Sequence, residues 1–234
     1  MRPSSGSARV PAAALLAACA LVAGPACDHG PVAAPPSTYP PGTVLALNGL
    51  PIRAQDVDVY AEAYARLEPG FVEAHCRRLA LTNVIFPRLA AVGIDPKARE
   101  AAHKRALEYK AALDGGASAS SPLVGPAEVR RQGNWKTIGL DAWIATVDRQ
   151  NGAWSDVFET PGAFELVRLV ERGKQAVAQE VQLDVAVVDF PYLDGDVFHT
   201  IDAALDAARL EIVDPAWRDY VPTLWQHRLH AQSP

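Results

Sequence analysis

Apolar residues recur along this chain with two different periods, which predict strands in some stretches and helices in others. Two short apolar runs in residues 43–52 flank Asn48-Gly49, a pair that favours a two-residue β-hairpin turn. Later, Trp154 to Glu159 and Phe164 to Val170 are rich in aromatic and β-branched residues and flank Thr160-Pro161-Gly162. These runs predict a second hairpin around residues 154–170.

Helical spacing takes over between the two hairpins. One predicted helix carries a single apolar face made by Val57, Tyr60, Tyr64 and Leu67. A longer helix follows from Val72 to Val92, and its wide apolar arc predicts that it is covered on more than one side. Pro87 should kink this helix near Asn83, because proline lacks the N–H that the Asn83 carbonyl would accept.

The remaining elements follow from caps, turn residues and alternation. Asp95-Pro96 has a favourable cap and first residue for a third helix, whose thin apolar face predicts docking on a surface. Residues 114–126 are rich in Gly, Ala and Ser and predict a loop. The other predicted elements are a short helix at 140–147 that Gly152 can terminate, a half-buried strand at 181–190 stopped by Pro191, a helix at 198–208 and a helical tail from Pro215.

The start of the chain has the pattern of a secretory signal. Arg2 and Arg9 precede an apolar run, residues 10–22, which is shorter than the roughly 20 residues that a bilayer-spanning helix needs. Cys27 is the preferred lipid acceptor because the sequence turns polar directly after it, and Cys19 is the alternative because Leu16-Ala17-Ala18-Cys19 fits a lipobox better. Cleavage without lipid attachment is the third reading.

These readings place the mature protein at the periplasmic face of a bacterial membrane. Asp28, directly after the preferred acceptor, resembles an inner-membrane retention signal. Residues 30–41 contain Pro, Ala, Ser and Thr without periodicity and predict a tether. With Cys27 lipidated, Cys76 is the only other cysteine of the mature chain, so no intramolecular disulfide is expected.

Composition excludes some classes of function. The 234 residues carry a formal net charge of -5, which argues against a nucleic-acid partner. No phosphate loop, Gly-x-Ser-x-Gly elbow or His-Glu-x-x-His motif occurs, so we expect neither a cofactor nor a metal. His75-Cys76 could be a nucleophile or a metal site, but a buried, inert thiol is the simpler interpretation. His227 and His230 could chelate a metal, but a solvated tail is the simpler interpretation.

The second predicted hairpin resembles the closing hairpin of parvulin-type peptidyl-prolyl isomerases. The shared features are Ser155, Glu159-Thr160-Pro161 and the run from Phe164 to Leu169. Gly162-Ala163 stands where the family has Phe-Gly, and Glu165 stands where it has an active-site histidine. The resemblance therefore implies the fold more strongly than the activity, and the catalytic residues stay unknown. The strand at 181–190 is a candidate for the family's opening strand in a rearranged order.

Residues 43–94 resemble the N-terminal region of SurA-like and PrsA-like foldases. A strand ends in Asn-Gly-x-Pro-Ile, an acidic residue opens a helix, and a long helix closes on Gly93-Ile94. Together the resemblances imply an α+β fold with a helical lobe and a reduced parvulin-like lobe that has an antiparallel sheet. The expected divisions are signal 1–26, tether 27–42, helical lobe 43–114, linker 115–134, and parvulin-like lobe with helical tail 135–234.

The implied function is that of a lipid-anchored chaperone or foldase for unfolded or exported polypeptides, with little or no isomerase activity. The alternatives are a non-catalytic subunit dedicated to one envelope or secreted protein, and an active prolyl isomerase. The residues expected to contact clients are Phe158, Phe164, Glu165, Phe190 and Tyr192. The apolar members of this set are also ordinary core candidates.

Overall fold

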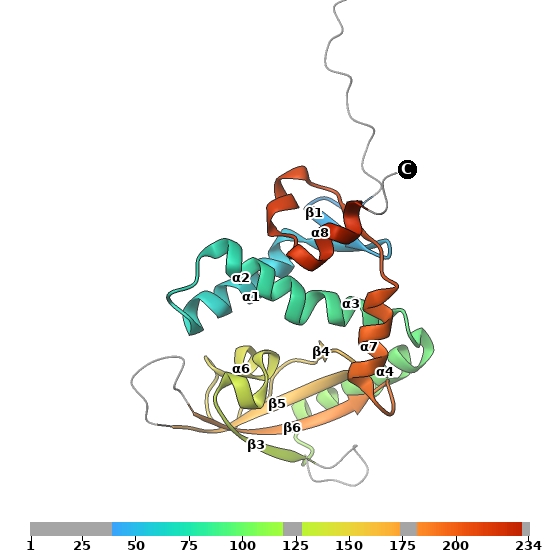
Figure 1. Cartoon of the computed structure of the whole chain (residues 1–234). Helices are drawn as coiled ribbons and strands as arrows, with labels where there is room; N and C mark the ends of the chain where they lie inside the picture. Colours follow the sequence, from blue (N-terminus) through green and yellow to red (C-terminus); the bar gives the residue numbers. More distant parts are fainter. Residues whose placement is uncertain (1–38, 119–127, 174–181, 231–234) are drawn as a thin grey trace, which may run out of the picture. The chain divides into compact units, whose positions relative to one another are not determined.

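The computed structural model describes residues 39–118, 128–173 and 182–230, which belong to one compact unit. The signal sequence, both candidate lipid acceptors and Asp28 lie outside these residues, so those readings stay predictions. Within the three ranges, no helix is both long enough and apolar enough to cross a bilayer. Helices combine with two antiparallel sheets, which confirms the α+β prediction (Figure 1).

The first sheet contains the predicted Asn-Gly hairpin. β1 (Thr43–Leu47) pairs antiparallel with β2 (Leu50–Arg53). Asn48 and Gly49 have φ angles of 52° and 79°, the left-handed conformation that this type of turn requires at both positions. A third strand from the far end of the sequence, β7 (Leu210–Ile212), pairs with the other edge of β1, so the strand order is β2-β1-β7.

The predicted helices follow, with one local change. α1 (Ala54–Leu67) leads to α2 (Glu73–Ala80), a π-helical turn η1 (Leu81–Ile85) and α3 (Phe86–Val92). The expected disturbance around Asn83 is therefore a widened turn directly before Pro87. A π turn suits this place because the proline ring would clash with the carbonyl four residues earlier in a regular helix.

The second sheet is built around the second predicted hairpin. β4 (Phe158–Thr160) and β5 (Ala163–Arg172) are joined by Pro161-Gly162, which confirms the hairpin, although its first strand is shorter than predicted. β6 (Leu183–Pro191) pairs with β5, and the edge strand β3 (Val129–Gly133) pairs with β6. The order is β3-β6-β5-β4, with every pair antiparallel.

Helices cover both faces of this second sheet. α4 (Pro96–Asp114), capped by Asp95 as predicted, packs on the face that carries Phe164 and Leu166. α6 (Leu140–Thr146), preceded by the short α5 (Trp135–Ile138), packs on the opposite face against Val167 and Leu169. α6 ends at Thr146, so the expectation that Gly152 terminates it is wrong. Gly152, with a φ of 86°, lies in the turn that leads toward the hairpin.

The last described segment returns to the first sheet. After α7 (Val197–Asp206) and β7 come a 3₁₀ helix, η3 (Pro215–Tyr220), and α8 (Thr223–His230). Trp217 and Trp225 are buried in the same apolar core as Leu45, Leu47 and other residues of β1. The predicted helical tail exists, and it packs in the core of the sequence-distant first hairpin. The lobe boundaries along the sequence stay a prediction.

Candidate functional site

The position that the parvulin resemblance assigns to a histidine lies on a polar part of the second sheet. Glu165 of β5 is directly opposite Asp189 of β6, and the Glu165 side chain shares its face with Val167. Glu165 is only 9% exposed. Thr160 Oγ1 donates a hydrogen bond to Glu165 Oε1 at 3.3 Å.

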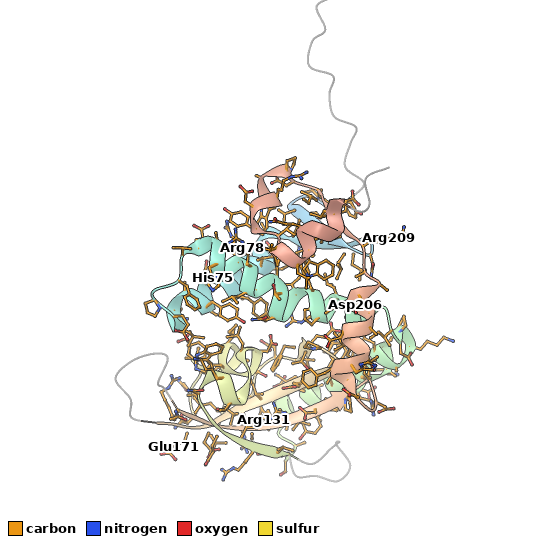
Figure 2. The ribbon with its side chains drawn as sticks, in the orientation of Figure 1. His75, Arg78, Arg131, Glu171, Asp206 and Arg209 are labelled. Carbon is orange, nitrogen blue, oxygen red and sulfur yellow. The ribbon has the colours of Figure 1, made fainter. Side chains whose placement is uncertain are left out.

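A single arginine faces both carboxylates. Arg131 Nη1 lies 3.7 Å from Glu165 Oε2, and Arg131 Nη2 lies 3.5 Å from Asp189 Oδ2. Arg131 is presented by β3, the edge strand next to β6 (Figure 2). The other carboxylate oxygen of Asp189 is buried and has no hydrogen-bond partner among the described residues. One positive charge is therefore shared between two negative charges.

This environment favours the protonated form of Glu165. The pKa of Glu165 is raised from 4.5 to about 7. Burial is the largest cause, and the neighbouring charge of Asp189 is the second. Arg131 and the Thr160 hydroxyl act in the opposite direction. A carboxyl group with such a pKa can donate or accept a proton near neutral pH.

A second polar group lies close by, between α1, α3 and α6. Arg88 Nη2 lies 2.8 Å from Asp141 Oδ1 and 2.9 Å from the hydroxyl of Tyr60, which donates to Asp141 Oδ1 at 2.8 Å. Burial raises the pKa of Tyr60 to about 12. The charge of Asp141 also raises the pKa of Glu165, so the two polar groups are electrostatically coupled.

No imidazole joins this polar cluster in the described part of the chain. His103 stacks on Phe164, which lies on the opposite face of the sheet. His75 lies on α2, away from the strand that carries Arg131, and packs against Phe71 (Figure 2). The described residues near Glu165 therefore offer no histidine where the parvulin resemblance implies one.

The motif residues that carry the resemblance have clear structural contacts. The Ser155 hydroxyl accepts a hydrogen bond from Val167 N at 3.0 Å. Both carboxylate oxygens of Glu159 lie 2.6 Å from Arg99 of α4, and Tyr192 also donates to Glu159 at 3.0 Å. The Arg99–Glu159 pair fixes the hairpin to α4, so the motif serves the fold in this chain.

The residues predicted to contact clients are mostly internal. Phe164, Phe190 and Tyr192 are 3%, 3% and 6% exposed and pack with α4 in one core. Phe158 is partly buried and packs against the core on the other face. Of the five, only Glu165 belongs to the polar cluster. A role in client binding stays a prediction for all of them.

The adjacent pair His75-Cys76 does not form a reactive site. Cys76 is 1% exposed and packs with Ala61 and Tyr64, and burial raises the pKa of its thiol. A raised pKa leaves less of the nucleophilic thiolate. Among the residues that the structure describes, no group of three or more His, Cys, Asp and Glu is placed to hold a metal ion.

Two grooves flank the outer edge of α1, and sequence reasoning missed both. The α1–α6 groove has a volume of about 190 Å³ and is lined by Val59, Glu62, Ala63, Arg66, Trp143, Ile144, Val147 and Asp148. The α1–α2 groove has a volume of about 280 Å³ and is lined by Asp58, Ala61, Glu62, Ala65, Glu73, Cys76 and Arg77. Glu62 borders both. The sequence offers one hint of these grooves, because Val59 is apolar but lies off the apolar face predicted for this helix. In the structure Val59 is 52% exposed.

Comparison with known proteins adds no relative to this picture. No protein-family model, no curated protein and no solved structure matches the chain significantly.

Proposed function

We propose that this protein is a membrane-tethered chaperone of the foldase type, which binds unfolded or exported polypeptides at the bacterial envelope without isomerising them. The tether and the envelope location rest on the signal-like N-terminal sequence. The foldase class rests on the resemblances in residues 43–94 and 140–172. Binding of clients rests on the grooves beside α1.

The observation that carries the proposal is the environment of Glu165, which stands where the resembled family has an active-site histidine. Glu165 is buried between Thr160, Arg131 and Asp189, and the described residues near it offer no imidazole. Prolyl isomerisation must lower a barrier of about 18–20 kcal/mol by desolvating and polarising the imide. A position closed by buried, polar protein side chains is poorly suited to receive a proline. The exposed grooves beside α1 remain available for binding.

Two assays on the full chain test the proposal. The first measures light scattering of a reduced, permanently unfolded client protein, whose aggregation the chain should suppress when present in stoichiometric amounts. The second measures cis-trans isomerisation of a proline-containing peptide, which should proceed at the uncatalysed rate. Glu165→His should leave that rate unchanged, because one histidine does not rebuild a desolvated proline pocket.

The outcomes separate the three functions. Turnover above background in the parent protein would reinstate the active isomerase. Failure to suppress aggregation, together with recovery of one stoichiometric protein from an envelope extract, would favour the dedicated subunit. Suppression of aggregation by several unrelated unfolded clients, without turnover, supports the chaperone.

A further inference from the structure

The two grooves beside α1 carry an excess of negative charge. Four carboxylates line them against two guanidinium groups: Asp58, Glu62, Glu73 and Asp148 against Arg66 and Arg77. Arg77 is shared between Asp58 at 2.9 Å and Glu73 at 2.8 Å. Glu62 has no ion pair within the described ranges, although it borders both grooves. The junction of the grooves therefore offers an unpaired carboxylate to a cation.

The α1–α6 groove is apolar along its floor. Val59 is 52% exposed, Ile144 is partly exposed, and Ala63 and Val147 lie beneath them. Its volume of about 190 Å³ lies below the roughly 300–1,000 Å³ of typical small-molecule sites. A groove of this size holds individual side chains of a polypeptide that passes along the surface.

Trp143, one of the groove residues, has an unused hydrogen-bond donor. The residue is 1% exposed, and its indole N–H has no acceptor among the described residues. The indole nitrogen is itself buried, so a ligand in the groove does not reach it. The guanidinium of Arg66 lies over the Trp143 ring at 5.9 Å and pairs with Asp148 at 3.5 Å. Both members of this pair are largely exposed, so the pair is weak and opens readily.

We infer that the α1–α6 groove, continued past Glu62 into the α1–α2 groove, binds an extended apolar polypeptide segment that has Lys or Arg beside its apolar residues. An apolar side chain of the segment packs on Val59 and Ile144. The adjacent cation pairs with Glu62. This inference rests on the proposed function and names the class of client.

Binding of three labelled peptides to the full chain, followed by fluorescence anisotropy, tests the inference. The first peptide is apolar with flanking lysines, the second has the same apolar residues with flanking glutamates, and the third is polar with flanking lysines. We expect the first to bind about tenfold more tightly than either of the others at low ionic strength. Raising the salt concentration to about 1 M should remove most of the advantage over the second peptide. Equal binding of the first two peptides at low salt would overturn the inference.

Two substitutions locate the site. Val59→Asp should weaken binding of the lysine-flanked apolar peptide about tenfold, since it places a charge on the apolar floor. Glu62→Lys should abolish the preference for lysine over glutamate flanks.

Phe198→Asp and Leu224→Asp are the matched controls, because both side chains are strongly exposed, at 84% and 68%, on α7 and α8. Peptide affinity should be unchanged in both. If either control weakens binding as much as Val59→Asp, the groove assignment is wrong. If Val59→Asp leaves peptide binding unchanged while the chain still suppresses aggregation, the inference fails and the chaperone proposal stands. If the parent chain neither binds peptide nor suppresses aggregation, the chaperone proposal itself fails.

Discussion

The two faces of the four-stranded sheet are built from the same strands but differ in polarity. Toward α4, β5 and β6 present Phe164, Leu166, Val188 and Phe190, which form a closed apolar core. Toward α1 and α6, the same strands present apolar residues at one end and the opposed carboxylates Glu165 and Asp189 at the other. Adjacent residues of one strand therefore differ completely in environment, because successive side chains point to opposite faces. We expect the apolar α4 face to raise the free energy of unfolding. We expect the buried carboxylates on the other face to lower it.

The largest expected effect is on the α4 face. Phe164→Ala should lower the free energy of unfolding by about 3–5 kcal/mol, because it removes a buried ring and leaves a cavity. Urea unfolding followed by circular dichroism measures the change. A loss below about 1 kcal/mol would mean that this face is not the stabilising one.

Glu165→Gln tests the other face through its pH dependence. The folded state binds the Glu165 proton more tightly than the unfolded state, since its pKa rises from 4.5 to about 7. The stabilisation that comes from this more tightly bound proton is therefore fully present below about pH 4.5, and it is lost as the pH rises to about 7. The variant should match the parent near pH 4 and exceed its stability by up to about 3 kcal/mol at pH 8. Urea titrations at several pH values measure this difference, and Glu171→Gln, exposed on the same strand, is the control.

Arg131→Met should change the free energy of unfolding less than Glu165→Gln does, and in the opposite direction. It leaves Glu165 and Asp189 facing each other without a cation, so the protein should lose about 1 kcal/mol at pH 8. The expected loss is modest because about a third of the Arg131 side chain is exposed. The loss should shrink near pH 5, where Glu165 is protonated. Thermal unfolding at both pH values checks this, and an equal loss at both would show that Arg131 acts through packing alone.

An effect of similar, modest size is expected for Tyr192→Phe on the α4 face. The Tyr192 hydroxyl accepts a hydrogen bond from Gly162 N at 3.2 Å and donates one to Glu159. Its removal should cost about 0.5–1.5 kcal/mol while the ring still packs in the core. Differential scanning calorimetry measures the change. A loss as large as that of Phe164→Ala would show that these polar contacts, rather than apolar packing, hold α4 in place.

Local signals predicted much of the fold. Asn48-Gly49 and Pro161-Gly162 marked both hairpins because turns with positive φ angles restrict the residue type. Asp95 and Pro96 marked the start of α4 for a similar reason. Each of these signals acts between neighbours in sequence, where the geometry of a turn or cap decides which residue types fit.

Long-range pairing escaped prediction. β3 has the sequence Val-Arg-Arg-Gln-Gly, which lacks the apolar alternation of a buried strand because it forms an edge. Because this strand carries no such pattern, nothing in the sequence placed Arg131 beside Glu165. The return of β7 and α8 to the first hairpin was equally hidden, since a three-residue strand and two tryptophans do not identify their partner.

The candidate site was predicted only in part. Glu165 was identified through the resemblance, and the structure brings it to Arg131 and Asp189, neither of which the sequence associated with it. Phe164, Phe190 and Tyr192 carried no sequence signal that distinguishes a groove from a core. The groove residues of α1 and α6 are separated by about 80 positions and meet only through tertiary packing.

The pairing of β1 with β7 has a consequence for the order in which the protein matures. β1, the first strand that the structure describes, completes its sheet and core only with β7 and with Trp217 and Trp225 near the other end of the described residues. The first hairpin therefore cannot complete its core until β7 and α8 have been synthesised.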